Sequence, residues 1–264
     1  MYATNYHRAS SLSEAEQMLA ASEEGKLLSG GQTLIPTMKQ RLAAPTDVVD
    51  LRHVAELKGI SVSGGVVKIG AGTTHAEVAG SADVKNACPA LAGLASHIGD
   101  PHVRHMGTIG GSIANNDPAA DYPSAMLALN ATIHTNKREI AADDFFVGMF
   151  ETALGDDEIV TAVSFEAPDS AAYQKFPNPA SRYAMAGVFV AKKGGTVRVG
   201  VTGAGSDGAY RASDMEQALA GSFSPDALDG VSVDPGGMLS DIHGTAEYRA
   251  HLVKVMAKRA VAAA

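Results

Sequence analysis

The chain has 264 residues, of which 45% are hydrophobic and 19% are charged, a composition that excludes intrinsic disorder as its general state. Its 21 basic and 29 acidic residues give a net charge of −8, and no long run of Lys or Arg is present, so we expect no nucleic-acid binding. The single cysteine, Cys88, excludes an intramolecular disulfide framework, a cysteine-based zinc site and a self-contained iron–sulfur cluster.

The chain is rich in glycine and poor in aromatic residues, with 28 glycines, no tryptophan and 5% aromatic residues. Such a composition indicates that the backbone closely approaches a ligand or another segment at several places. Residues 1–17 lack the basic and apolar regions of a secretory signal, and no apolar stretch approaches the roughly 20 residues that a membrane span needs. We therefore expect a cytoplasmic protein without a membrane span, as one unpaired cysteine also indicates.

Residues 1–55 predict a small β–α–β-like unit. Ser13 and Glu16 have the spacing of a capping box, which predicts that the first helix begins at Ser13 and ends near Gly25. The elements expected after this helix are a strand over 26–28, a helix or turn over 37–42 and a strand over 47–51.

Residues 56–168 predict a second unit of strands and short helices. The expected elements are strands over 66–69 and from Gly70 onward, helices over 75–80, 90–98 and 124–129, and strands over 131–134 and 158–165. Between them, residues 99–123 are dense in Gly, Asn, Asp and Pro and are expected to form a long loop. Such a loop is uncommon in a compact domain unless it binds something, although an ordered surface loop with Asx turns has the same composition.

Residues 167–181 are punctuated by Pro and predict a joint between domains. Beyond the joint, the patterns predict a β-hairpin, a helix and a long last helix. These elements are expected over 184–191 and 196–202, over 213–219, and over 245–263.

Two glycine-rich segments are suited to an anion. The first, SGGQT at 29–33, follows a strand, and its tandem glycines allow backbone N–H groups to turn toward an anion. It is neither a Walker loop nor the dinucleotide fingerprint, and alone it predicts only a strand-to-helix turn. The second, GTIGG at 107–111, precedes several polar residues, including Asp121. Together the two glycine pairs suit the two ends of a pyrophosphate, and Asp121 suits ribityl or ribose hydroxyls, with an ordered surface loop as the alternative.

Other chemistry-bearing residues give weaker signals. His97, His102 and His105 lie near Asp100 but follow no zinc-binding spacing, so we expect surface or packing histidines. Cys88 is expected to be a small buried hydrophobe. No nucleophile motif is present, so we expect no acid–base or nucleophilic machinery in this chain.

Four segments of the chain, taken in their order along the sequence, resemble the corresponding segments of a known family. The chain resembles the FAD-binding medium subunit of the molybdenum hydroxylases, the group of xanthine dehydrogenase and aerobic carbon-monoxide dehydrogenase, and it is more similar to the carbon-monoxide dehydrogenase branch. The resemblance extends over essentially the whole chain and is carried by residues 26–42, 99–129, 175–191 and 240–260.

The resemblance implies a site for FAD. The family motif AGGxS reads SGGQT here and would surround the pyrophosphate, while TIGG is intact at 108–111. Ile98 matches a residue against the isoalloxazine ring, and Lys175 matches a basic residue at the flavin. The residues implied at the site are Ser29, Gly30, Gly31, Gln32, Thr33, Ile98, Gly107, Thr108, Gly110, Gly111, Ser112, Asp121, the apolar pair Ile159 and Val160, and Lys175.

The resemblance also implies a fold and partners. The expected fold is α+β, with a vanillyl-alcohol-oxidase-type FAD-binding module of two subdomains at 1–55 and 56–168. A C-terminal domain at 175–264 would hold a small antiparallel sheet and helices. The partners would be a large molybdopterin subunit and a small subunit with two [2Fe-2S] clusters, assembled as a dimer of heterotrimers in the cytoplasm or, through the partners, at the inner face of the membrane.

The implied function is electron transfer from the iron–sulfur clusters to an external acceptor, with the hydroxylation carried out on a partner. The alternatives are a stand-alone flavin-dependent oxidase and a flavin-free scaffold subunit. The sequence does not select among carbon monoxide, an aldehyde, a purine or an N-heterocycle as the substrate of the complex, nor does it select the electron acceptor.

Overall fold

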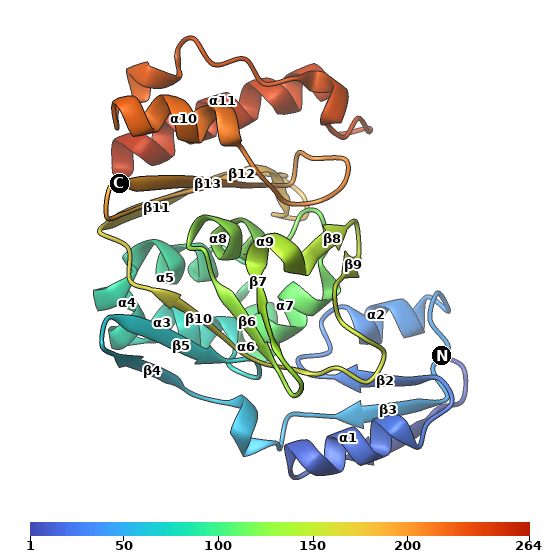
Figure 1. Cartoon of the computed structure of the whole chain (residues 1–264). Coiled ribbons are helices and arrows are strands. Elements are labelled where there is room, and N and C mark those ends of the chain that lie inside the picture. Colours follow the sequence, from blue (N-terminus) through green and yellow to red (C-terminus); the bar gives the residue numbers. More distant parts are fainter.

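The computed structural model describes all 264 residues and contains three main β-sheets, of which the third lies above the other two in the view of Figure 1. The first sheet is parallel and has the strand order β1-β3-β2. Its strands are β1 (Asn5–Arg8), β2 (Gly25–Leu28) and β3 (Asp47–Asp50), and its helices are α1 (Leu12–Ala20) and α2 (Leu34–Lys39), with a 3-10 turn at Ala55–Leu57. The predicted strands of this unit are confirmed, and the predicted second helix begins three residues earlier than expected.

The N-cap of α1 is Ser11, two residues before the predicted cap, and the helix begins at Leu12. The Ser11 side chain accepts a hydrogen bond from the Glu14 N–H at 3.2 Å, and the Glu14 carboxylate accepts from Ser10 N–H and Oγ. The sequence holds the same Ser-to-Glu spacing twice, at Ser11–Glu14 and at Ser13–Glu16. The prediction of Ser13 as the cap was therefore wrong because the spacing does not distinguish the two registers.

The second sheet is antiparallel, with the strand order β4-β5-β10-β6-β7. Its strands are β4 (Ile60–Ser63), β5 (Val66–Gly70), β6 (Thr132–Thr135), β7 (Glu139–Ala141) and β10 (Val160–Glu166), accompanied by the two-stranded ribbon β8 (Phe146–Gly148) and β9 (Glu151–Thr152). The helices of this unit are α3 (His75–Gly80), α4 (Ala82–Ala87), α5 (Pro89–Ser96), α6 (Pro101–Met106), α7 (Ile109–Asn115), α8 (Tyr122–Ala128) and α9 (Ala142–Phe145).

The strand expected from Gly70 onward is not formed. Strand β5 ends at Gly70, and the chain then turns to Thr74, which caps α3 in a complete capping box with Glu77. The box satisfies the first N–H groups of α3, so the predicted helix over 75–80 is confirmed, and the residues between Gly70 and Thr74 form a turn in place of the predicted strand.

The long loop expected over 99–123 is also wrong, because the segment contains α6, α7 and the start of α8. The Asp100 side chain caps α6 by accepting from Val103 N–H, and the Thr108 side chain caps α7 by accepting from Gly111 N–H. A Cβ on Gly110 would lie 2.4 Å from the Ala71 Cβ. The glycines that suggested a loop therefore allow α7 to pack closely against the chain after β5.

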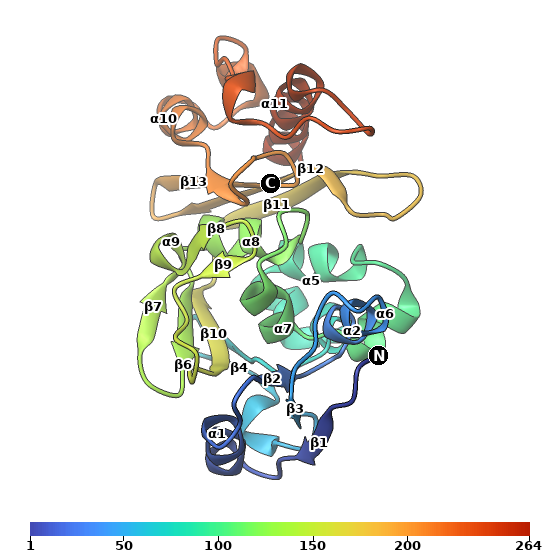
Figure 2. The same ribbon diagram turned by 90° about the vertical axis from the view of Figure 1, so that its right-hand side faces the viewer.

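The third sheet is antiparallel and lies between α8 on one side and α10 and α11 on the other (Figures 1 and 2). Its elements are β11 (Ser170–Pro177), β12 (Ala184–Lys193), β13 (Thr196–Thr202), β14 (Tyr210–Arg211), α10 (Ser213–Gly221) and α11 (Ala246–Ala263), with 3-10 turns at Pro225–Leu228 and Pro235–Gly237. Strand β12 is buried on both faces, with Phe189 in the core of the second unit and Val188 and Val190 in the core under α10 and α11. The predicted hairpin and both predicted helices are confirmed.

Three units are proposed from these sheets, over 1–55, 56–168 and the remainder of the chain. Much of the joint expected over 167–181 is strand β11, which begins at Ser170. A third unit starting at residue 175 would divide β11, so we propose that it starts at Ser170. No helix of the structure has both the length and the apolar character of a membrane span.

Substitution of Gly200 tests the contact between β13 and α8. A Cβ at this position would lie 2.0 Å from the Ser124 carbonyl oxygen, so we expect Gly200→Ala to lower the free energy of unfolding by roughly 1–3 kcal/mol. The matched control is Gly93→Ala in α5, where nothing lies within 4 Å of the new Cβ and where Ala is expected to stabilise by about 0.5–1 kcal/mol. Chemical denaturation measures both values, and equal stabilities of the two variants would contradict the tight contact.

Candidate functional site

A cavity of about 1520 Å³ is lined by residues from all three units. Every residue predicted for the site lines this one cavity, although the predicted segments lie far apart in the sequence. The first unit contributes the loop after β2, the second unit contributes the segment around α6 and α7, and the third unit contributes Lys175 on β11. The cavity exceeds the roughly 300–1,000 Å³ of sites for drug-sized ligands.

The loop after β2 presents unpaired backbone donors. The N–H groups of residues 30–34 have no hydrogen-bond acceptor in the protein. Gly31 has φ +71°, a left-handed conformation that glycine adopts without strain. This loop therefore offers a run of N–H groups to an anionic ligand, as the sequence predicted for SGGQT.

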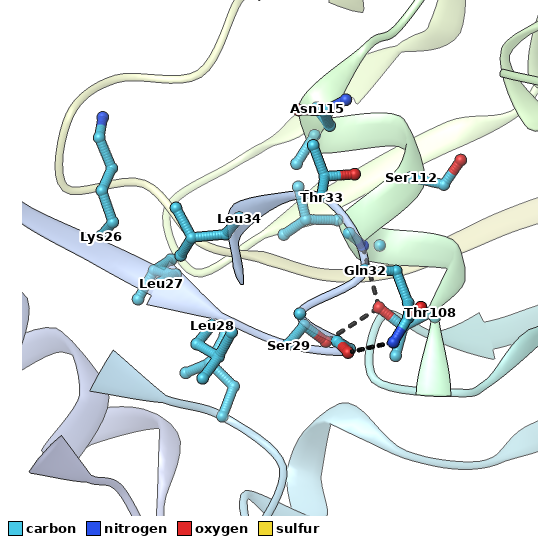
Figure 3. Close-up of a pocket in the computed structure, with 18 of the residues that line it drawn as sticks. Lys26, Leu27, Leu28, Ser29, Gln32, Thr33, Leu34, Thr108, Ser112 and Asn115 are labelled. Carbon is cyan, nitrogen blue, oxygen red and sulfur yellow. Dashed lines mark hydrogen bonds between the residues drawn. The ribbon is translucent and has the colours of Figure 1, made fainter. Parts of the chain in front are cut away.

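The segment at 107–111 lies directly against this loop. The Ser29 and Thr108 hydroxyl oxygens are 2.9 Å apart (Figure 3), and a Cβ on Gly30 would lie 2.1 Å from the Met106 carbonyl oxygen and 2.6 Å from the Gly107 Cα. The loop and the segment can meet only because Gly30 has no side chain.

The two glycine pairs differ in what they offer to a ligand. Gly110 N–H donates to the Ala71 carbonyl at 2.9 Å, and Gly111 N–H donates to Thr108 Oγ1 at 3.1 Å. The second pair therefore contributes close packing rather than free N–H groups. The side chains of Thr108 and Ser112 lie near the loop after β2 (Figure 3). Ser112 and Asn115 come from α7 beside the loop and also line the cavity.

Asp121 and Lys175 form a buried ion pair at another part of the cavity wall. The Lys175 Nζ lies 2.9 and 3.0 Å from the two Asp121 carboxylate oxygens, and the Tyr173 hydroxyl donates to Asp121 Oδ1 at 2.5 Å. Burial raises the pKa of the Asp121 carboxyl, and the Lys175 charge and the Tyr173 hydrogen bond oppose this rise. The sequence predicted that Asp121 contacts ligand hydroxyls. In the structure its carboxylate is bound by Lys175 and Tyr173, two contacts that the sequence did not predict.

Apolar residues line other parts of the cavity. Ile98 is half-buried, and Ile159 and Val160 are buried. Ile159 packs in the core of the first unit and its N–H donates to Asn136 Oδ1 at 2.8 Å, while Asn136 Nδ2 donates to Glu16 on α1. This link holds α1 and the predicted apolar pair together.

Glu158 lies next to this pair and is fixed by Arg138. The Arg138 guanidinium bonds both carboxylate oxygens of Glu158, at 2.9 and 3.0 Å. These hydrogen bonds are the main cause that lowers the Glu158 pKa to about 2. The carboxylate also accepts from Gly155 N–H, so this ion pair fixes the cavity-lining turn at 155–158.

Two residues that line the cavity, His75 and Tyr183, were not predicted from the sequence. His75 begins α3, and burial with the nearby Arg104 charge lowers its pKa to about 4. Its Nδ1 is buried without a partner. Tyr183 lies in the β11–β12 loop, half-exposed, and burial with Asp117 and Asp121 raises its pKa. His75 carries only the signal of a helix start, whereas Tyr183 lies inside a segment that resembles the family.

The histidines near Asp100 and the single cysteine remain to be placed. The structure contains no group of three or more His, Cys, Asp or Glu side chains that could hold a metal ion. The His102 side chain is 98% exposed, and His105 Nδ1 contacts the Pro101 carbonyl. Cys88 is fully buried, as predicted, and burial raises its pKa to about 11.

The sequence model of a family described as "FAD binding domain in molybdopterin dehydrogenase" matches residues 2–167. The chain belongs to this family. The nicotine 6-hydroxylase medium subunit of Paenarthrobacter nicotinovorans is 36% identical over 273 residues, covering 98% of this chain and 96% of the relative. The carbon monoxide dehydrogenase medium chain of Afipia carboxidovorans is 35% identical over 278 residues, covering 97% and 95% of the two chains.

A solved relative has the same fold. The crystal structure of a Cu,Mo-CO dehydrogenase in its cyanide-inactivated form contains a chain that matches with a TM-score of 0.91 and 34% identity, covering 99% of this chain and 98% of that one. These matches confirm the resemblance, the α+β fold with its C-terminal antiparallel sheet and helices, and the assignment to oxidoreductase subunits. The chain is thus an FAD-binding subunit of the molybdenum hydroxylase type, and the roles of individual residues stay predictions.

The low pKa of His75 predicts a pH-dependent stability. Because the folded pKa of about 4 lies below the ordinary 6.5, the stabilisation is fully present above pH 6.5 and is lost as the pH falls toward 4. We expect the free energy of unfolding of the wild type, relative to His75→Gln, to fall by roughly 2–3 kcal/mol between about pH 7 and about pH 4.5. A constant difference for His75→Gln would contradict the buried neutral ring.

Proposed function

We propose that the cavity holds FAD and that the chain is the electron-transfer subunit of a three-part molybdenum hydroxylase. In this role it takes electrons from iron–sulfur clusters of a partner subunit and passes them to an external acceptor. The observation that carries the proposal is the run of unpaired N–H groups at residues 30–34 in the wall of a large cavity. Such a run suits the two negative phosphates of a dinucleotide.

The residues present fit FAD over the length of the cavity. The pyrophosphate would lie at the loop 30–34, beside the hydroxyls of Ser29, Thr108 and Ser112. The flavin ring would lie toward Ile98 and Lys175, and the adenine toward the wall formed by 23–28 and 154–159. When bound, FAD supplies reversible redox chemistry, while the protein orients it and sets the electrostatics around it.

The ring end of the proposed site is near the molecular surface. Tyr183, which lines the cavity together with residues 180–182 of the β11–β12 loop, is 53% exposed. An electron donor on another subunit can approach such an end without entering the cavity. We therefore place the partner with the iron–sulfur clusters at this surface.

The proposed partners are a large molybdopterin subunit and a small subunit with two [2Fe-2S] clusters, in a dimer of heterotrimers. Relatives of similar identity are named for nicotine and for carbon monoxide. Since both are medium subunits or chains, we propose that a partner selects the substrate and that this chain performs no hydroxylation.

A flavin spectrum tests the cofactor. The purified chain, after incubation with FAD, is expected to show flavin absorbance at a stoichiometric ratio. Gly30→Ala is expected to lower the FAD content, because its Cβ would collide with the Met106 carbonyl and displace the loop. Gly93→Ala, which meets open space, is the control and should keep the wild-type content. A folded wild-type chain that binds no flavin would favour the scaffold alternative.

Substrate reduction tests the electron-transfer role. In the assembled complex, the substrate is expected to bleach the flavin absorbance, whereas the isolated flavin-loaded chain should not respond to the same substrate. A response of the isolated chain would favour the stand-alone oxidase.

A further inference from the structure

Tyr173 makes a short hydrogen bond to Asp121, which lines the cavity. Its hydroxyl lies 2.5 Å from Asp121 Oδ1, and Asp121 is in turn paired with Lys175. Tyr173 is 9% exposed, and the side chains of Asp121 and Lys175 are 5% and 6% exposed. A buried ion pair of this kind keeps its geometry only when its remaining lone pairs and protons are satisfied.

The backbone is arranged to allow this contact. Tyr173 and Lys175 are two residues apart on β11 and so lie on the same face of the sheet. Lys175 pairs with Gly187 on β12, and a Cβ at Gly187 would lie 2.4 Å from the Tyr173 hydroxyl. The tyrosine hydroxyl therefore occupies space that only a glycine leaves open.

Lys175 has a donor left for a ligand. Its ammonium carries three N–H groups, and its protein partners are the Asp121 carboxylate and, at 3.4 Å, the His97 carbonyl. Since Lys175 lines the cavity next to Ile98, the remaining donor and the positive charge are available to a molecule bound there.

We propose that Tyr173 is a positioning residue, whose hydroxyl fixes Asp121 and through it the Lys175 ammonium at the ring end of the cavity, and so raises the reduction potential of the bound flavin. This inference rests on the proposed function. The O–H dipole partly neutralises the carboxylate. Without it, Asp121 draws the ammonium more strongly to itself and presents more negative charge to the ring, which disfavours the electron-rich reduced flavin.

The test compares two buried tyrosines that are close together. Tyr122 follows Asp121 in the chain and is fully buried, but its hydroxyl has no hydrogen-bond partner. The flavin midpoint potential is measured in the FAD-loaded wild type, Tyr173→Phe and Tyr122→Phe, with Lys175→Met as the reference for complete loss of the charge. Each variant is also checked for thermal stability and FAD content.

In Tyr173→Phe, the affinity for reduced relative to oxidised FAD is expected to fall by roughly three- to tenfold, the worth of one hydrogen bond. The midpoint potential of the flavin in Tyr173→Phe is expected to fall, as in Lys175→Met but by a smaller amount. Tyr122→Phe is expected to keep the wild-type potential. Gly187→Ala reaches the same contact by a second route, since its Cβ would lie 2.4 Å from the Tyr173 hydroxyl and 3.1 Å from the ring carbon that carries it, and would displace the hydroxyl from Asp121. It should shift the potential in the same direction.

The outcomes separate the inference from the proposed function. A folded wild type that binds no FAD overturns both. An FAD-loaded Tyr173→Phe with the wild-type potential overturns the inference alone, as does an equal shift in Tyr122→Phe. If Tyr173→Phe does not fold, the potential of Gly187→Ala decides.

Discussion

The candidate site depends on one close contact between two backbone segments, Gly30 against Met106 and Gly107. A methyl group at Gly30 would lie closer to the Met106 carbonyl oxygen than any nonbonded carbon can. This contact brings Ser29 and Thr108 within hydrogen-bond distance and places the free N–H groups of the first unit beside the helix α7 of the second. Without it, the two halves of the cavity wall would not face each other.

The cavity is formed between units, so its shape depends on the contacts that join them. Asn136 bonds both Ile159 and Glu16 and thereby joins the second unit to α1. On the other side, the Thr202 hydroxyl on β13 donates to the Pro118 and Ala120 carbonyls, which fixes the chain just before Asp121. Each of the three units supplies part of the cavity wall, and no unit forms the whole wall alone. Small changes at these contacts are therefore expected to affect the whole site.

Local patterns predicted most of the elements, because hydrophobic alternation and helical spacing are visible within a few residues. The hairpin of β12 and β13 is an example. Some failures arose because the deciding contact lies far away in the sequence. Gly110 and Gly111 indicated a loop, but they lie in α7, where Ala71 leaves no room for a side chain at Gly110. Others arose locally, because the two possible capping registers of α1 have the same spacing.

The sequence predicted which residues line the candidate site more completely than it predicted the contacts among them. The resemblance gave residues that all line one cavity, but it did not give the contacts among them. Tyr173 lies 52 residues from Asp121, and no spacing rule connects the two. The buried state of His75 likewise follows from its packing near Tyr122, which the sequence alone does not reveal.

Hydrogen exchange of the backbone amides tests the central claim most directly. The N–H groups of residues 30–34, which have no acceptor in the protein, are expected to exchange rapidly in the flavin-free chain and to become protected when FAD is added. The N–H groups of Gly110 and Gly111, which already donate to Ala71 and Thr108, should be protected in both states. Unchanged rapid exchange at 30–34 in a chain that has bound FAD would contradict the proposed phosphate site.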